Sequence, residues 1–153
     1  VLFAAPLSAA AAEETQSLNP AERAFAAAMS NATLAGRFTA GDEDAAKPER
    51  YELGEVRKVG DGLWLFPARI RYGKNDVTLP ITLPVKWAGD TAVIIVDKVG
   101  FPGLGTYSAR VMIHGGQYAG YWQGDGYGGH LFGKIEKAAD ADGDNAAKDE
   151  ATD

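Results

Sequence analysis

The two histidines of the chain are the most obvious candidates for acid-base or metal chemistry. The alternation of apolar and polar residues places His114 at the end of one expected strand and His130 at the start of another, at opposite rims of a sheet. At about 3.3 Å per residue over six or seven residues, they lie on the order of 20 Å apart and cannot share a metal ion. Ser108 is equally far from His114 along the same strand face, too far for a nucleophile and its base. We therefore predict no catalytic residue and no metal site.

Carboxylates and glycine motifs suggest no cofactor either. Asp61, Asp90 and Asp125 stand in glycine-flanked turns, where an aspartate stabilises the turn by bonding to nearby backbone. The stretch "DADGDN" at 140–145 lacks the glycine and glutamate that a calcium loop needs at its sixth and twelfth positions. "GLG" and "GDGYGG" lack the lysine and the following helix of a phosphate loop. Cysteine is absent, which excludes disulfides, thiol catalysis and cysteine-based metal sites. We predict a non-enzymatic protein without a cofactor.

Aromatic residues provide the best candidate site. The connections expected at 41–48, 73–76, 99–105 and 124–129 all fall at one end of an antiparallel meander, and the short turns fall at the other. Six residues point inward near this loop-rich end or lie on its loops: Tyr72, Phe101, Leu104, Tyr107, Trp122 and Tyr127. Aromatic faces for stacking and tyrosine hydroxyls for orientation suit a small hydrophobic or aromatic ligand. The alternative is that these side chains only plug the end of the fold.

One helix and eight strands must position these residues. Asn19 as N-cap, Pro20 at the first helical position and Glu22 at the capping-box position predict a helix start. An apolar stripe around Phe25 should dock this helix against the body. From Leu34 onward the period is two, and every connection contains glycine. The expected strands are 34–40, 49–59, 63–72, 77–87, 91–98, 106–114, 117–123 and 130–137.

Three hairpins can be registered from the sequence, with turns at 74–75, 89–90 and 115–116. All three registers place apolar residues on one common face. The fold class is therefore predicted as all-β, an eight-stranded antiparallel up-and-down meander that closes into a small barrel. An open half-barrel and a two-sheet sandwich are the alternatives. The expected pairs are Trp64 with Val85, Val85 with Ile94, and Ile113 with Tyr118.

Two prolines interrupt the strand "VTLPITLPVKW" at 77–87. Pro80 and Pro84 have the same parity, so their missing N–H groups would both face the same neighbouring strand. The strand can then pair fully on one side only. We predict a sparse hydrogen-bond ladder along the other side.

An apolar patch is expected on the outer face of the third to fifth strands. Such a patch is rarely left bare, so either the helix stripe around Phe25 covers it or it binds a protein partner or a second copy of the chain. The patch consists of Leu65, Pro67, Pro84, Val93 and Ile95.

Composition divides the 153 residues into four parts. The formal charge of −6 at pH 7 comes mostly from residues 138–153, which we predict to be a disordered acidic tail. The nearly neutral remainder has no basic patch, which argues against nucleic-acid binding. Residues 1–12 resemble the remnant of a signal peptide, and no apolar run is long enough to span a membrane, so a secreted or periplasmic location is expected. Residues 13–31 form a linker and the helix, and 32–137 the barrel domain.

The layout of a helix, then "LAGRF" at 34–38, then an eight-stranded meander resembles the lipocalin and calycin group of small secreted barrels. Members of that group typically carry Gly-x-Trp on the first strand, where this chain has Gly36-Arg37-Phe38. The resemblance implies a barrel that binds a small ligand. The chain is also similar in general kind to uncharacterised secreted bacterial proteins, which implies no particular activity.

The sequence therefore predicts an exported, non-enzymatic barrel that binds a small hydrophobic or aromatic ligand at its loop-rich end. One alternative is a structural or protein-interaction module with a solid core that uses the outer apolar patch. Another is an enzyme on a calycin-like barrel, which needs polar groups converging inside, and the expected registers place almost none there.

Overall fold

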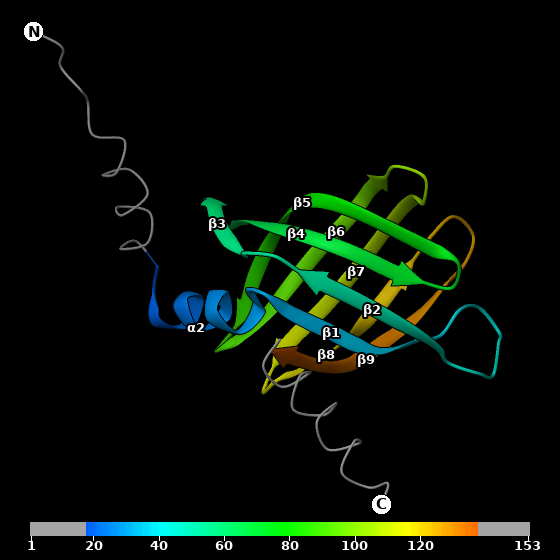
Figure 1. Cartoon of the computed structure of the whole chain (residues 1–153), viewed down its shortest axis with the longest axis horizontal. Coiled ribbons are helices and arrows are strands. Elements are labelled where there is room, and N and C mark those ends of the chain that lie inside the picture. Colours follow the sequence, from blue (N-terminus) through cyan, green and yellow to red (C-terminus); the bar gives the residue numbers. More distant parts are fainter. Residues whose placement is uncertain (1–17, 138–153) are drawn as a thin grey trace, which may run out of the picture.

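The protein is an antiparallel β-barrel with a short helix across one end (Figure 1). The structure is a computed structural model and describes residues 18–137, so the predicted signal segment 1–12 and acidic tail 138–153 lie outside the described residues. The helix is α2 (Pro20–Met29), and the strands are β1 (Ala32–Phe38), β2 (Lys47–Leu53), β3 (Arg57–Gly60), β4 (Leu63–Tyr72), β5 (Asn75–Ala88), β6 (Thr91–Phe101), β7 (Gly105–His114), β8 (Gln117–Gln123) and β9 (Gly128–Lys137).

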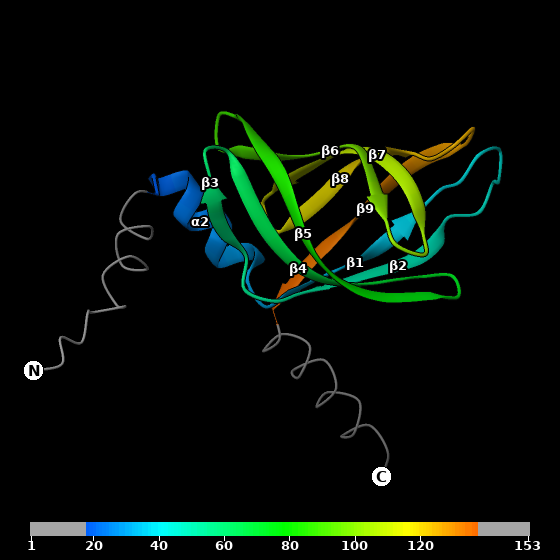
Figure 2. The ribbon, with the colours of Figure 1, turned by 90° about the horizontal axis from the view of Figure 1, so that it is seen from above.

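Eight of the strands close on themselves. The sheet order is β2-β1-β9-β8-β7-β6-β5-β4-β3, and β2 also pairs with β4, which completes the circle of eight and leaves β3 as a short addition beside β4. The predicted all-β, eight-stranded antiparallel barrel with one N-terminal helix is confirmed. The strands curl round one interior in Figure 2. Closure satisfies the sheet edges, and the apolar side chains form one core.

The strand expected at 49–59 is wrong in one respect, because it breaks into β2 and β3. Between them Val56 turns into the core, where it is 2% exposed. The Gly54 N–H donates to the Pro67 carbonyl at 2.8 Å, so the chain stays attached to β4 while it changes direction. The break lets β2 pair with the second half of β4, from Ala68 to Tyr72, while β3 pairs with its first residues, from Leu63 to Leu65.

Two of the three predicted registers are confirmed, and one is wrong by two residues. Val85 faces Ile94, and Ile113 faces Tyr118, as predicted. Trp64, however, lies opposite Leu83, because the turn between β4 and β5 falls one residue earlier than predicted. A slip of two preserves parity, so the side chains still point to the predicted faces.

The proline prediction is confirmed by the pairing of β5. This strand pairs with β4 from Asn75 to Pro84 but with β6 only from Val85 to Ala88. The Val85 N–H donates to the Gly62 carbonyl, on the β4 side, so the even residues Pro80 and Pro84 face β6. The missing donors therefore coincide with the missing ladder between β5 and β6.

Helix α2 closes the tight end of the barrel. The Asn19 side chain accepts from the Glu22 N–H at 2.9 Å, and the Glu22 carboxylate accepts from the Asn19 N–H at 3.0 Å, which is the predicted capping box. The same carboxylate binds Lys58 of β3 at 2.7 Å. Phe25 packs edge-on against Trp64 at a centroid distance of 5.0 Å. The expectation that its stripe covers the outer patch is therefore wrong: Phe25 packs instead on the inward-facing rings of Trp64, Phe66 and Trp87 at this end of the barrel.

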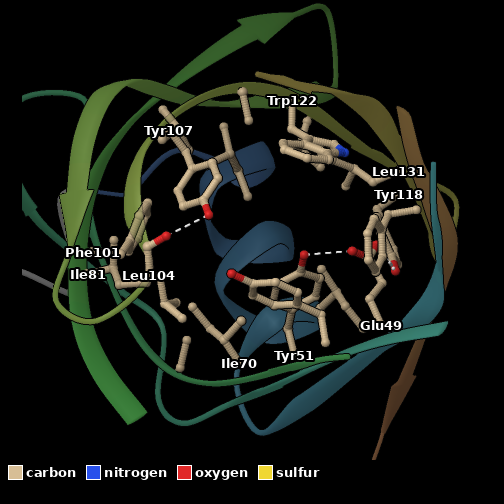
Figure 3. A pocket seen from close by; sticks show the side chains of 18 of the residues that line it. Glu49, Tyr51, Ile70, Ile81, Phe101, Leu104, Tyr107, Tyr118, Trp122 and Leu131 are labelled. Carbon is tan, nitrogen blue, oxygen red and sulfur yellow. Dashed lines mark hydrogen bonds between the residues drawn. The ribbon is translucent and has the colours of Figure 1, made fainter. Parts of the chain in front are cut away.

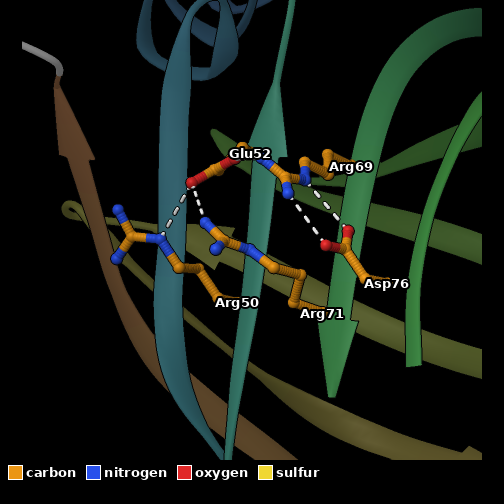
Figure 4. A network of polar contacts seen from close by, with 5 residues as sticks. All are labelled: Arg50, Glu52, Arg69, Arg71 and Asp76. Carbon is orange, nitrogen blue, oxygen red and sulfur yellow. Dashed lines mark hydrogen bonds and ion pairs between the residues drawn. The ribbon is translucent and has the colours of Figure 1, made fainter. Parts of the chain in front are cut away.

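An ion-pair network lies over the outside of the closing seam between β2 and β4 (Figure 4). Arg50 and Arg71 stand directly opposite each other in the ladder, and the Glu52 carboxylate binds both guanidinium groups. Arg69 continues the network to β5 by a two-point contact with Asp76, at 2.9 and 2.8 Å. Glu52 thus compensates the repulsion between two facing arginines and helps to keep the barrel closed.

Candidate ligand-binding cavity

The barrel contains a cavity of about 460 Å³ that reaches its loop-rich end (Figure 3). Met29 of α2 lines it from the tight end, and the strands supply mostly apolar walls. The structure brings together all six residues predicted for this end of the fold, and all six line the cavity: Tyr72, Phe101, Leu104, Tyr107, Trp122 and Tyr127. They surround a space rather than filling it.

Five aromatic rings of the cavity are packed edge-on into one continuous cluster. Trp122 is central, with Tyr127 at a centroid distance of 5.5 Å and Tyr107 at 6.0 Å. Phe38 joins the cluster at 6.2 Å from Trp122 and at 5.9 Å from Tyr72. Edge-on packing holds each ring in a defined orientation, so part of the cavity wall is preformed.

Hydrogen bonds fix the cluster to the loops at the open end. The Tyr107 hydroxyl donates to the Leu104 carbonyl at 2.6 Å, which ties the β6–β7 loop to β7. The Trp122 indole N–H donates to the Thr39 carbonyl at 3.0 Å, which ties β8 to the segment after β1. The loop-rich end is therefore positioned by side chains that also line the cavity.

A buried acid, Glu49, is the main polar group of the cavity. It is 6% exposed, and each of its carboxylate oxygens accepts a hydrogen bond, from the Tyr51 hydroxyl at 2.7 Å and from the Tyr118 hydroxyl at 2.9 Å (Figure 3). Burial raises the pKa of Glu49 above its ordinary value, although both hydroxyl donors act to lower it. Burial and the nearby carboxylate also raise the pKa of both tyrosines, which keeps them protonated as donors.

Two glycines allow Tyr118 to reach this acid. Tyr118 of β8 pairs with Gly133 of β9, Gly133 with Gly36 of β1, and Gly36 with Glu49 of β2. The row crosses three strand spacings, about 14 Å along the sheet. A Cβ on Gly133 would lie 2.7 Å from the Tyr118 ring, and one on Gly36 would collide with the hydroxyl. The tyrosine can therefore lie along the wall only because both neighbours lack side chains.

Sequence reasoning missed Glu49, Tyr51 and Tyr118 as a group. The expectation that almost no polar groups converge inside the barrel is wrong, because these three do. The signal was present in "KPERYEL" at 47–53, where Glu49, Tyr51 and Leu53 share one parity and so one face. No tight turn sets the register of that strand with the strand before it, so the sequence alone did not show which of its faces points inward.

The two histidines lie outside the barrel at opposite ends. His114 is exposed, and its Nδ1 lies 3.2 Å from the Thr91 hydroxyl and 3.7 Å from an Asp90 carboxylate oxygen. His130 is also exposed. Among residues 18–137, no group of acidic residues and histidines is arranged to hold a metal ion. Within the same range, no helix has the length and apolarity needed to cross a bilayer.

The predicted outer patch keeps its face but loses part of its continuity. The corrected register places Thr82 opposite Leu65, and Pro80 opposite Pro67. All five predicted patch residues are half-buried: Leu65, Pro67, Pro84, Val93 and Ile95. Larger exposure occurs farther round the barrel, at Met112 (50%), Tyr121 (53%) and Phe132 (47%) on β7 to β9.

Fold and site together define a closed eight-stranded antiparallel β-barrel with an internal cavity that reaches one end, a layout consistent with the calycin group. Comparison of the chain with protein-family models, curated proteins and solved structures finds no match.

Proposed function

We propose that the protein is an exported, non-enzymatic barrel that binds a small hydrophobic or aromatic ligand in its cavity. The observation that carries this proposal is an aromatic-lined space of about 460 Å³ within a closed barrel. That volume falls within the usual range of small-molecule sites. It equals the share of about fifteen liquid waters, which suits a ligand of roughly fifteen to twenty non-hydrogen atoms.

The chemistry of the cavity wall supports binding rather than catalysis. Its buried ionisable side chains are one carboxylate, Glu49, and tyrosines whose hydroxyls are held in their protonated form. Acid-base catalysis at neutral pH usually pairs two groups with separated pKa values, and both histidines lie outside the barrel. The proposal of export depends on the apolar segment at residues 1–12.

Fluorescence of N-phenylnaphthylamine, a neutral hydrophobic probe of about seventeen non-hydrogen atoms, tests the proposed function. Ala109 of β7 lines the cavity, whereas Ala88 at the end of β5 is exposed and lies outside it. Ala109→Phe fills part of the cavity and should weaken probe binding by about tenfold or more. Ala88→Phe makes the same change outside and should leave binding unaltered.

Two outcomes would contradict the proposed cavity site. One is a wild-type protein that produces no saturable rise in probe fluorescence. The other is equal binding by both variants, with circular dichroism showing that each is folded. Either would place hydrophobic binding elsewhere or remove it.

A second candidate function is protein interaction through the outer face of the barrel. It is favoured by the exposure of Met112, Tyr121 and Phe132, close to Val93 and Ile95 of the predicted patch. If the partner is a second copy of the chain, the protein should form dimers, which sedimentation velocity detects. Self-association that Phe132→Lys abolishes would support it, and a monomer at all concentrations would refute it.

A further inference from the structure

The position of Glu49 implies a particular kind of ligand for the cavity. Its side chain lies in the wall among aromatic and aliphatic groups, and the Tyr51 and Tyr118 hydroxyls both donate to it (Figure 3). The two hydroxyl donors favour the ionised form of the carboxyl group, which only accepts hydrogen bonds, and so act against the burial that raises its pKa. Each oxygen keeps a further lone pair for another donor.

No cation within residues 18–137 compensates the charge of Glu49. The ion pairs of the described residues do not include it, and its two polar contacts are the neutral tyrosine hydroxyls. Lys47 lines the cavity rim, but its ammonium group pairs with Glu43 at 2.6 Å. A buried charge without a partner is costly, so a ligand that brings a positive charge gains what the protein itself lacks.

The aromatic rings around Glu49 also favour a positive charge on the ligand. Tyr51 and Tyr118 flank the carboxylate, and Tyr72 stands opposite Glu49 in the β2–β4 ladder. Trp122 and Tyr107 complete the wall toward the open end. The faces of such rings carry negative potential and attract ammonium groups, most strongly where water is excluded.

We propose that the ligand is a hydrophobic amine, whose protonated nitrogen binds the Glu49 carboxylate while its apolar or aromatic body occupies the rest of the cavity. This inference depends on the proposed function, since it names the ligand class of the same site. The tyrosine hydroxyls act as positioning groups, because they fix the direction of the carboxylate while leaving its remaining lone pairs open to the ammonium.

A competition experiment with three matched compounds tests the inference. Bound N-phenylnaphthylamine is displaced from the full chain at neutral pH by phenylbutylamine, phenylbutanol or phenylbutanoate, which share one body and carry a positive, a neutral and a negative head. A charge-assisted hydrogen bond to Glu49 should make the amine bind about tenfold more tightly than the alcohol. Phenylbutanoate should bind most weakly, because its negative head is repelled by Glu49.

Two variants assign the preference to the cavity acid. Glu49→Gln keeps the size of the side chain and removes its charge, so amine and alcohol should bind equally within about twofold. Glu55→Gln makes the same change at an exposed position between β2 and β3, and the tenfold preference should remain. Unfolding measured by circular dichroism verifies that both variants are folded.

The outcomes separate this inference from the proposed function. If the probe binds but the alcohol competes as well as the amine, the cavity is a site for neutral ligands and the inference is overturned. The same holds if Glu49→Gln keeps the amine preference. If the probe does not bind at all, the proposed function itself fails.

Discussion

Replacing Gly36 or Gly133 by alanine should destabilise the barrel strongly, because backbone atoms and the Tyr118 side chain occupy the space that a Cβ would need at each position. A Cβ on Gly36 would lie 2.8 Å from the Cα of Gly133, and still closer to the Tyr118 hydroxyl and the Phe132 carbonyl. Ordinary contacts of a Cβ begin at about 3.4 Å, and the nearest atom of β9, the Phe132 carbonyl oxygen, would lie at 2.0 Å, so the backbone of β9 would have to retreat by about 1.4 Å. The hydrogen-bonded ladder between β1 and β9 resists that movement.

The cost has two parts. Overpacking of this kind costs about 1–3 kcal/mol, and loss of the Tyr118 hydrogen bond to a charged group costs about 1.5–3 kcal/mol. At about 2.1 cal/mol/K of unfolding entropy per residue, the roughly 120 described residues would convert a loss of about 4 kcal/mol into a fall in Tm of about 16 °C. Tyr118→Phe removes the hydroxyl without overpacking and should give the second part alone.

Thermal unfolding followed by circular dichroism measures these effects, with Gly100→Ala as the matched control. Gly100 also lies in a strand, has no positive φ, and its added Cβ would meet nothing nearer than the Thr106 hydroxyl at 3.9 Å. Gly100→Ala should therefore be neutral or stabilising by up to about 1 kcal/mol. If Gly36→Ala melts within about 2 °C of the control, the contact of Tyr118 with Glu49 does not depend on the two glycines, and the reasoning above is wrong.

Three further changes test the acid, the helix cap and the closed end. Burial raises the pKa of Glu49 in the folded protein, so its share of stability is present below the unfolded pKa and is lost as pH rises through the folded pKa. Glu49→Gln should therefore gain stability relative to wild type as pH rises above the ordinary range of a glutamate. Urea unfolding at a series of pH values measures the difference, and a constant difference would refute the sign. Asn19→Ala removes a capping-box acceptor and should cost about 1 kcal/mol by urea unfolding, with no loss disproving its role. Phe25→Ala should cost about 3–5 kcal/mol, since the ring is 5% exposed among three aromatic rings, and a loss below about 1 kcal/mol would show that α2 is dispensable for closing the barrel.

The fold was predictable because alternation of side chains is insensitive to small errors in register. The turn between β4 and β5 begins at Gly73, which has φ 53°, rather than at Lys74, and this shifts the whole ladder by two residues. Both registers bury the same face of both strands, so the apolar pattern cannot distinguish them. For that reason the six residues predicted at the loop-rich end still line the cavity. The outer patch depends on which residues are neighbours across the ladder, so its predicted continuity was partly wrong.

Glu49 was harder to predict because its position depends on pairings that no short turn determines. The eight residues that connect β1 and β2 and the join of β9 to β1 are governed by how the closed barrel staggers its strands. The sequence nevertheless carries a trace of the arrangement in two inward-facing glycines, Gly36 and Gly133, on adjoining strands. Glycine at such positions weakens a strand unless another group occupies the space above it. Here that group is the Tyr118 ring, and its hydroxyl holds the acid that gives an otherwise apolar cavity its charge.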